Sequence, residues 1–548
     1  MSALVVIYWV NKNNFIYYWD YSGYWTSTLN QKRFIYNNSF IDSIRALYNS
    51  INYDDYNVFL PTILALPLKI FGDDFSSYVI CIHIFFFLPT VAVLGLISVK
   101  LVEFANSKKK TVFLFTVLAA VLFPSNYYAT LQGYIDIAYL LPMSIVIYLF
   151  IDYDFSRISL STNISIASLL ILIWICRRYT IYFIIGYVAA MFVKAIYELY
   201  FNRSFVMVKQ IFINFLLIGG ISFGILLVAF RHFFLHALLS NYSYMYSAYD
   251  APLVTKFHSL VMSFGFITAI IIVYSGVVNI IYHRNIINYI SMFVITIVET
   301  IIFWMTQDMG VQHRMILNVP VFVMCCMPFI YVGSTPKNIK QFMKSTFVCI
   351  LIFICYITNF AKAFIPFCPD KGTSSIYSSR YTPLVRNDIM ELNTLANYLN
   401  TLTKDTNKHI YVLASGSVLN CDILRKLNMP ASFNAIPSME NTCDVDLRDG
   451  FPTAFLSAEY VVTTTPIQTH LQTGQEVVRY LADNLQNPTS YIGTHFSEIY
   501  EIELDYNIKA VVYEKNSKFS NEDLEKMQQY YTQLYPNSDS LFKERIHF

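Results

Sequence analysis

Long apolar runs separated by short polar breaks dominate the first two thirds of the chain. A bilayer core of about 30 Å requires roughly 20 apolar residues for each crossing helix. The apolar runs predict ten spans, near 78–99, 111–124, 137–151, 164–176, 179–200, 210–235, 257–282, 287–305, 315–333 and 345–365. Residues 1–10 are also apolar but too few to cross alone, so they either belong to a further span or lie at the membrane surface. We therefore expect a polytopic α-helical membrane protein with about 11 spans.

The segment 11–77 combines apolar and polar positions in a different way. The stretch FIYYWDYSGYW at 15–25 places aromatic side chains around a single acid, Asp20. Apolar residues at 40, 41, 44, 47, 48 and 51 have helical spacing and predict a helix on the membrane surface over 39–51. Asp54 and Asp55 precede a second apolar segment that is interrupted by proline. We expect an amphipathic external loop here rather than a simple connection.

The remainder of the chain, 366–548, alternates short apolar runs with amphipathic helical patterns. These patterns predict helices at 388–403, 475–486 and 521–535, strands at 409–415 and 458–466, and a hairpin within 498–515. The last helix is expected to begin with Asn521 as its N-cap. Strands alternating with helices indicate a small mixed sheet. The chain is thus expected to divide into a multi-span transmembrane domain, 1–365, and a soluble C-terminal α/β domain, 366–548.

Composition and charge support this division. Hydrophobic residues make up 55% of the chain and charged residues 14%, against about 25% charged residues in ordinary globular proteins. Residues 1–366 contain 23 bases and 14 acids, and 367–548 contain 15 bases and 22 acids, so charges of +9 and −7 give the total of +2. A single soluble domain, a disordered chain, a collagen-like fibre and a nucleic-acid-binding protein are excluded.

The distribution of Lys and Arg in the short connections predicts the orientation. If the connection after 78–99 is cytoplasmic, twelve basic residues lie in inside connections and five in outside ones. The five outside residues are Arg177, Arg178, Arg231, Lys256 and Arg314. Cytoplasmic connections are enriched in Lys and Arg. We therefore expect a plasma-membrane protein in which 11–77 and the C-terminal domain lie on the outer face.

The nine cysteines indicate no metal site, because their spacing matches neither zinc nor iron–sulfur ligation. Cys368, Cys421 and Cys443 lie in the part expected outside, where disulfides are permitted. A Cys421–Cys443 bridge is one arrangement, and Cys368 is either an alternative partner or a free thiol. The acids of CDVDLRDG at 443–450 lack the spacing and the final Glu of a calcium loop, which indicates an acid-rich turn.

Asp20 has two interpretations. It is either a solvated acid within an aromatic belt or a general base that accepts a proton from a substrate hydroxyl. The arrangement resembles the GT-C superfamily of integral membrane glycosyltransferases, which have many spans, an acid in the first external loop close to the first helix, and interfacial helices after it. Many members also carry a soluble C-terminal domain. The resemblance implies Asp20 as the catalytic base and a polyprenyl-phosphate sugar as the donor. The family loop often carries paired acids, whereas Tyr21 follows Asp20 here.

Several other external residues are candidates for donor or acceptor binding. Gly133, Tyr134 and Asp136 resemble a Gly-Tyr-x-Asp stretch of bacterial members, and Asp136 is either a wall of the pocket or the start of a helix. Arg177 and Arg178 either form a tight turn with snorkelling side chains or bind the lipid phosphate. The proposed phosphate-binding residues are Arg177, Arg178, His313 and Arg314, and the proposed acceptor- or sugar-binding residues are Trp19, Tyr21, Tyr24, Asp54, Asp55, Asp136 and Gln312. Glu299, inside an expected span, is a further functional candidate.

These features predict a GT-C-type glycosyltransferase that moves a hexosyl or pentosyl group from an undecaprenyl-phosphate donor to a cell-surface glycan or lipid-linked acceptor. No cofactor is required, although a divalent cation is compatible with the pattern. Membrane lipid is a partner and nucleic acid is not. The alternatives are a transporter or flippase for lipid-linked sugars, a surface-glycan polymerase or ligase, and a membrane scaffold in which Asp20 has no role.

Overall fold

The computed structural model describes residues 2–102, 106–282, 286–333 and 383–547, with short stretches between 343 and 357. The expected span at 345–365 falls largely outside these ranges, and Cys368 falls wholly outside. The chain forms two compact units. The first comprises Met1–Lys12, Tyr24–Ser240 and Ala251–Pro383, and the second comprises Asn13–Gly23, Asn241–Asp250 and Leu384–Phe548.

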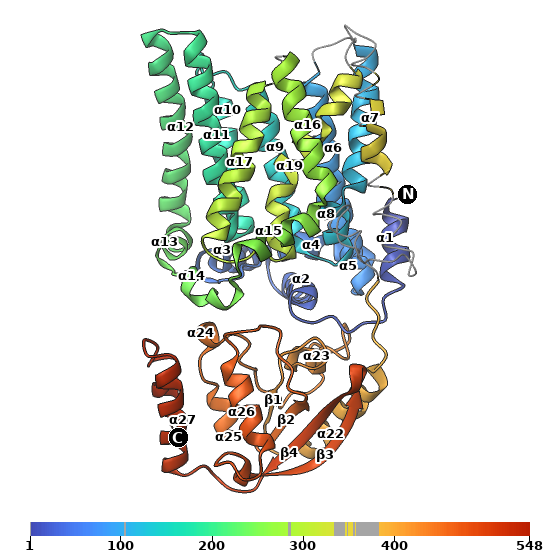
Figure 1. Cartoon of the computed structure of the whole chain (residues 1–548), viewed down its shortest axis with the longest axis vertical. Coiled ribbons are helices and arrows are strands. Elements are labelled where there is room, and N and C mark those ends of the chain that lie inside the picture. Colours follow the sequence, from blue (N-terminus) through green and yellow to red (C-terminus); the bar gives the residue numbers. More distant parts are fainter. Residues whose placement is uncertain are drawn as a thin grey trace. The chain divides into compact units, whose positions relative to one another are not determined.

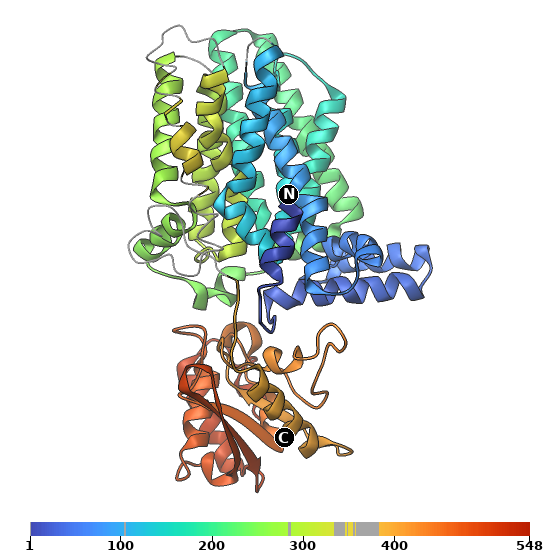
Figure 2. The ribbon, with the colours of Figure 1, turned by 90° about the vertical axis from the view of Figure 1, so that its right-hand side faces the viewer.

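The first unit is a bundle of apolar helices. Its main helices are α1 (Ser2–Val10), α2 (Asp20–Asn37, whose first turn belongs to the second unit), α3 (Phe40–Tyr53), α4 (Phe59–Phe71), α5 (Phe75–Ile82), α6 (Leu88–Lys100), α7 (Asn106–Leu122), α8 (Pro124–Leu131), α9 (Leu140–Ile151), α10 (Leu160–Cys176), α11 (Ile181–Phe201), α12 (Phe205–Ala229), α13 (Arg231–Leu239), α15 (Leu253–Phe264), α16 (Phe266–Tyr282), α17 (Ile286–Trp304), α18 (Val311–Arg314) and α19 (Asn318–Gly333). The long helices run side by side, and α3 lies across one end of them (Figures 1 and 2).

Four helices in the described residues are long and apolar enough to cross a membrane: Phe75–Lys100, Arg178–Phe201, Phe205–Ala229 and Ile286–Trp304. The pair Leu253–Phe264 and Phe266–Ile281 would be a fifth span if it is counted as one. Shorter apolar helices occupy Phe59–Phe71, Ile135–Ile151, Leu160–Cys176 and Val311–Met327. The chain is therefore a polytopic helical membrane protein, as the apolar runs predicted.

Two of the expected spans are not single straight helices. The run at 210–235 contains two helices, because α12 ends at Ala229 and α13 begins at Arg231. The run at 257–282 is bent by 84° between α15 and α16. The bend lies at Gly265, whose φ of +78° is readily adopted only by glycine. Apolar length alone therefore overestimated the continuity of these two segments.

The external segment contains one predicted helix and one that was missed. The helix expected over 39–51 is present as α3, with the Ser39 side chain accepting a hydrogen bond from the backbone N–H of Asp42 as an N-cap. Its exposed apolar residues, Phe40, Ile41 and Ile44, give it the amphipathic character expected of an interfacial helix. Helix α2 was not predicted, because its mixed aromatic and polar residues show no clear apolar stripe.

The second unit contains a mixed four-stranded sheet in the order β1-β2-β4-β3. The strands are β1 (Ile410–Leu413), β2 (Tyr460–Thr465), β3 (Phe496–Leu504) and β4 (Ile508–Lys515). β1 and β2 are parallel, with Ile410 opposite Tyr460, whereas β4 is antiparallel to both β2 and β3. The predicted mixed sheet and hairpin are confirmed.

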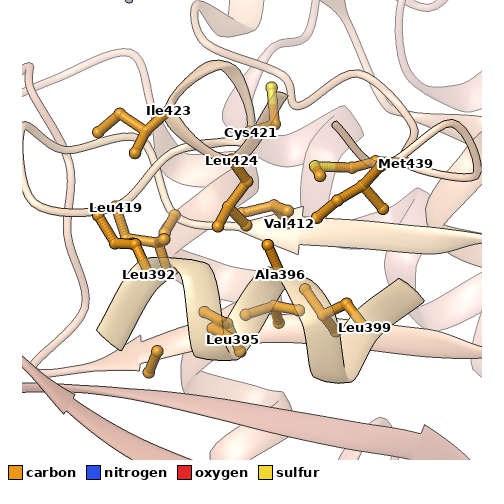
Figure 3. Packing of buried hydrophobic residues seen from close by; sticks show 14 of the residues in the cluster. Leu392, Leu395, Ala396, Leu399, Val412, Leu419, Cys421, Ile423, Leu424 and Met439 are labelled. Atoms are coloured by element: carbon orange, nitrogen blue, oxygen red, sulfur yellow. The ribbon is translucent and has the colours of Figure 1, made fainter. Parts of the chain in front are cut away.

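Helices cover both faces of this sheet, since neighbouring residues of a buried strand point to opposite sides. On one face, Val412 packs with Leu392, Leu395 and Leu399 of α22 (Ile389–Thr403), as Figure 3 shows. On the other, Leu413 packs in the cluster formed by α26 (Glu476–Gln486) and α27 (Asn521–Leu534). All three helices were predicted, but the N-cap of α27 is Ser520 rather than Asn521, because the Ser520 hydroxyl accepts from the Asp523 N–H.

The Cys421–Cys443 bridge does not form. Both cysteines are free and buried. Cys421, at the start of α23 (Cys421–Arg425), belongs to the cluster on the α22 face, whereas Cys443 belongs to the cluster on the opposite face. The sheet separates the two clusters, so the two thiols lie on different faces.

Candidate active site

A buried ion pair between Arg177 and Asp136 forms the centre of the polar cluster in the first unit. Arg177 follows the end of α10 in an extended conformation, and Asp136 lies in a short 3₁₀ turn, Ile135–Tyr139, before α9. The Nε and Nη2 atoms of Arg177 donate to the two carboxylate oxygens of Asp136 at 2.7 and 3.1 Å. The side chains are only 10% and 1% exposed. This bidentate geometry fixes the plane of the guanidinium.

Aromatic residues surround this pair. The hydroxyl of Tyr179 donates to Asp136 at 2.6 Å, and the hydroxyl of Tyr139 donates to the backbone carbonyl of Gln312 at 3.1 Å. The Tyr24 ring of α2 faces the Arg177 guanidinium, with 4.1 Å between the ring centroid and Cζ. Such a contact is a cation–π interaction. The sequence-predicted residues Tyr24, Asp136 and Arg177 are thus brought together.

Arg177 retains hydrogen-bonding capacity beyond this pair. A guanidinium has five N–H donors, and two of them bind Asp136. With respect to the residues that the structure describes, its Nη1 group makes no hydrogen bond. An additional anion, such as a phosphate oxygen, could bind at Nη1 while the salt bridge persists.

Arg178 is engaged elsewhere in the same unit. Its Nη2 lies 2.5 Å from the carboxylate of Asp55 and donates to the backbone carbonyl of Asp54 at 3.1 Å. Asp55 also lies 2.9 Å from Nε2 of His236, and the Asp54 carboxylate accepts from Ser50. Arg178 therefore fixes the end of α3, and both acids have partners of their own.

Gln312, His313 and Arg314 lie in and around α18. The His313 ring makes an edge contact with Tyr179 at 4.8 Å between centroids, and its Nδ1 accepts from the Gly310 N–H. Arg314 instead donates to the Met309 carbonyl at 2.7 Å and to the Ser263 hydroxyl of α15 at 2.5 Å. His313 thus belongs to the Arg177 cluster through Tyr179, whereas Arg314 secures the junction with α15.

Asp20 lies in the second unit, as the first residue of α2. The preceding Trp19 packs its ring on His470, with centroids 4.6 Å apart, and Tyr21 makes an edge contact with Phe15 at 6.2 Å. Burial raises the pKa of Tyr249 to about 12, and the negative charge of Asp20 adds to this effect. The predicted base is therefore part of a polar environment built by the C-terminal unit.

A hydrogen-bond network that was not predicted from the sequence lies at the carboxyl ends of β1 and β2. The Ser415 hydroxyl donates to Asp444 at 2.6 Å and lies 3.0 Å from Nδ1 of His470. Burial raises the pKa of Asp444 to about 6 and lowers that of His470. The available signal was positional, because polar residues after parallel strands gather at one edge of a sheet.

The remaining candidates are a metal site and the buried acid Glu299. Within the described ranges, no group of three or more His, Cys, Asp or Glu side chains could hold a metal ion. Glu299 of α17 is fully buried, and neither carboxylate oxygen has a hydrogen-bond partner among the residues with described positions. Glu299 packs near Gly186 of α11, where its Cγ lies 3.5 Å from the position that a Cβ would occupy.

No protein-family model and no curated protein sequence matches this chain. Among solved structures, it is similar to ArnT from Cupriavidus metallidurans bound to undecaprenyl phosphate, with 11% identity, a TM-score of 0.49, and coverage of 93% of this chain and 96% of that one. It is also similar to the Archaeoglobus fulgidus oligosaccharyltransferase in the apo form, with 10% identity, a TM-score of 0.46, and coverage of 95% and 74%. The same enzyme in complex with Zn and sulfate has 11% identity and a TM-score of 0.45, with coverage of 92% of this chain and 71% of that one.

Proposed function

We propose that the chain is a membrane glycosyltransferase that moves a sugar from a polyprenyl-phosphate donor to a surface glycan or lipid-linked acceptor on the outer face of the plasma membrane. The observation that carries the proposal is the buried Arg177–Asp136 pair, whose guanidinium keeps an uncommitted Nη1 group. A cation held in this way suits a lipid phosphate, because it is oriented before the ligand arrives.

The reaction assigns one role to each side chain. The acceptor hydroxyl attacks the anomeric carbon of the donor, and the bond between this carbon and the phosphate oxygen breaks. Asp20 accepts the hydroxyl proton, and the sugar is transferred with inversion. Arg177 stabilises the negative charge that develops on the leaving lipid phosphate. The donor already carries a good leaving group, so the residues fit a reaction in which a divalent cation is optional.

A transfer assay tests the proposal. Purified protein is given radiolabelled undecaprenyl-phosphate sugars and cell-envelope acceptor, and wild type is compared with Asp20→Asn and Arg177→Gln. Loss of a positioned base typically costs about 10²–10⁴-fold, so Asp20→Asn should fall by that range with donor binding intact. Arg177→Gln should weaken donor binding as well as turnover.

Matched controls are Asp42→Asn and Arg45→Gln on α3, whose side chains form an exposed pair at 3.7 Å. Both should retain transfer. Wild-type transfer that Asp20→Asn preserves would remove Asp20 as the base. Transfer that Arg177→Gln preserves with an unchanged donor KM would remove Arg177 from phosphate binding.

One observation favours a flippase for lipid-linked sugars as a second candidate. The α15–α16 pair is broken at Gly265, and discontinuous helices are typical of transporter binding sites. A flippase would move lipid-linked sugar between the leaflets of a liposome without changing it chemically. This movement in the absence of any transfer from the donor panel would place the flippase first.

A further inference from the structure

The N-terminal residues before Asp20 are built into the C-terminal unit. The backbone of Asn14 pairs with the strand-like segment 384–386, donating to the Leu384 carbonyl at 2.9 Å and accepting from the Arg386 N–H at 2.7 Å. Ile16 and Tyr18 are buried in the same core cluster as α22 and β1. Residues 14–18 are thus tied to the sheet unit by both backbone hydrogen bonds and apolar burial.

The residue directly before Asp20 has a strained backbone. Trp19 has a φ of +47°, in the left-handed region that residues with a Cβ rarely adopt. Such a conformation persists only when surrounding contacts over-determine it, and these conformations cluster at functional sites. The contacts that impose it are therefore informative about the role of this turn.

Two side chains of the C-terminal unit supply these contacts. One carboxylate oxygen of Asp422 in α23 accepts from the Trp19 backbone N–H at 2.6 Å and from the Ser22 hydroxyl at 3.2 Å. The carboxylate thereby supports the N-terminus of α2, where backbone N–H groups lack intrahelical partners and the dipole favours negative charge. The His470 and Trp19 rings make a tilted contact, with 4.6 Å between their centroids.

His470 is itself held from several elements of the unit. Its Nδ1 lies 3.0 Å from both the Ser415 hydroxyl and the Gln475 amide nitrogen, and its Nε2 lies 3.2 Å from the Tyr249 hydroxyl. These partners come from the ends of β1, the start of α26 and the segment 241–250. Because hydrogen-bond partners from three segments hold the His470 ring, its orientation against Trp19 is fixed.

We propose that the C-terminal unit orients the catalytic base, with Asp422 and His470 as positioning residues that fix the turn at Trp19 and hence the direction of the Asp20 carboxylate. This inference rests on the proposed function, because it assigns a purpose to the geometry before Asp20. The C-terminal unit is then a component of the active enzyme rather than an accessory module.

The test combines kinetics with hydrogen exchange on the full-length protein. Asp422→Ala removes the acceptor for the Trp19 N–H, whereas Asp422→Asn keeps an oxygen in its place. Misplacement of a catalytic group by about 1 Å can cost about 10²-fold, so Asp422→Ala should lower kcat by about that factor with donor KM unchanged. Asp422→Asn should restore most of the activity, and His470→Ala should resemble Asp422→Ala.

Hydrogen exchange followed by mass spectrometry gives a readout that is independent of activity. Peptides covering 14–24 should exchange faster in Asp422→Ala and His470→Ala, while peptides from β1 and β2 remain protected. Glu440→Ala, which removes an acid paired with His409 at 2.9 Å in the same unit, serves as the matched control. It should change neither kcat nor the exchange of 14–24.

The possible failures are distinguishable. If Asp20→Asn is inactive but Asp422→Ala and His470→Ala keep the wild-type kcat, the positioning role is wrong, whatever the exchange data show. A lowered kcat with unchanged exchange of 14–24 would also overturn it, because the turn would not have moved. Full transfer by Asp20→Asn would overturn the proposed function, and this inference with it.

Discussion

The Asp136–Arg177 pair allows a stringent test of how the polar cluster contributes to stability. Asp136→Asn removes the negative partner and leaves a guanidinium that is 10% exposed. Because a buried charge without its partner is costly, breaking a buried pair typically lowers stability by about 3–5 kcal/mol. The Tyr179 hydroxyl also loses its carboxylate acceptor, which adds about 1 kcal/mol. We expect a total loss of about 4–6 kcal/mol.

The double variant Asp136→Leu with Arg177→Met should be much less destabilised. Replacing both members of a buried pair by apolar residues of similar volume is often neutral or stabilising. The two changes should therefore be strongly non-additive, with the double variant closer to wild type than either Asp136→Leu or Arg177→Met alone. Transfer should still be lost in the double variant, because the phosphate-binding cation is absent.

The measurement is the thermal midpoint of detergent-solubilised protein. It is determined from the fraction of protein that remains monodisperse after heating. Asp154→Asn is the control, since Asp154 and Arg157 form an exposed pair at 3.4 Å that should be worth less than about 1 kcal/mol. The reasoning is refuted if Asp136→Asn lowers the midpoint no more than Asp154→Asn. It is also refuted if the double variant is as unstable as the two single changes combined.

Three further predictions concern stability. Leu395→Ala should cost about 2–5 kcal/mol, measured by chemical unfolding, because Leu395 is fully buried against the sheet; Leu534→Ala, at a 40% exposed position, should cost far less. Gly265→Val should lower the yield of folded protein, because valine resists the φ of +78°, and a yield equal to wild type would contradict this. Burial raises the pKa of Asp444 from 3.8 to about 6. Between these values the folded state binds more protons than the unfolded state. The free energy of unfolding should therefore fall by on the order of 2 kcal/mol as pH rises from about 4 to 6. Asp444→Asn should remove that slope in pH-dependent melting.

Apolar length predicted a polytopic helical bundle because a bilayer imposes a simple requirement on each span. Within the described residues, four helices, or five with the bent pair, are long and apolar enough to cross, against the ten spans expected. The same criterion failed at Gly265 and at the junction of Ala229 with Arg231, where local backbone geometry decides the outcome. Helix α2 was missed for a related reason, since its aromatic residues do not follow a helical period. The three C-terminal helices were predicted well because each has one buried and one exposed side. Strands β1 and β2 are buried on both faces, and their short apolar runs were enough to predict them.

The sequence indicated individual residues of the candidate site but not which of them contact one another. Asp136 and Arg177 were both named, yet their pairing joins positions 41 residues apart, and local patterns contain no information about it. Likewise, the sequence named Arg178 and Asp55 separately, and their ion pair could not be predicted from local patterns. The Cys421–Cys443 bridge was excluded by the side of the sheet that each thiol occupies.

The segment Asn13–Gly23 has two structural roles. After Lys12 it enters the second unit, contributes Ile16 and Tyr18 to the core, and then begins α2, which continues into the first unit. Full burial of an aliphatic or aromatic side chain is worth about 1.5–3 kcal/mol, so these two residues are a substantial part of what stabilises the α22 face. The stability of the second unit and the geometry at Asp20 therefore depend on the same segment, Asn13–Gly23, and a change that loosens one should disturb the other.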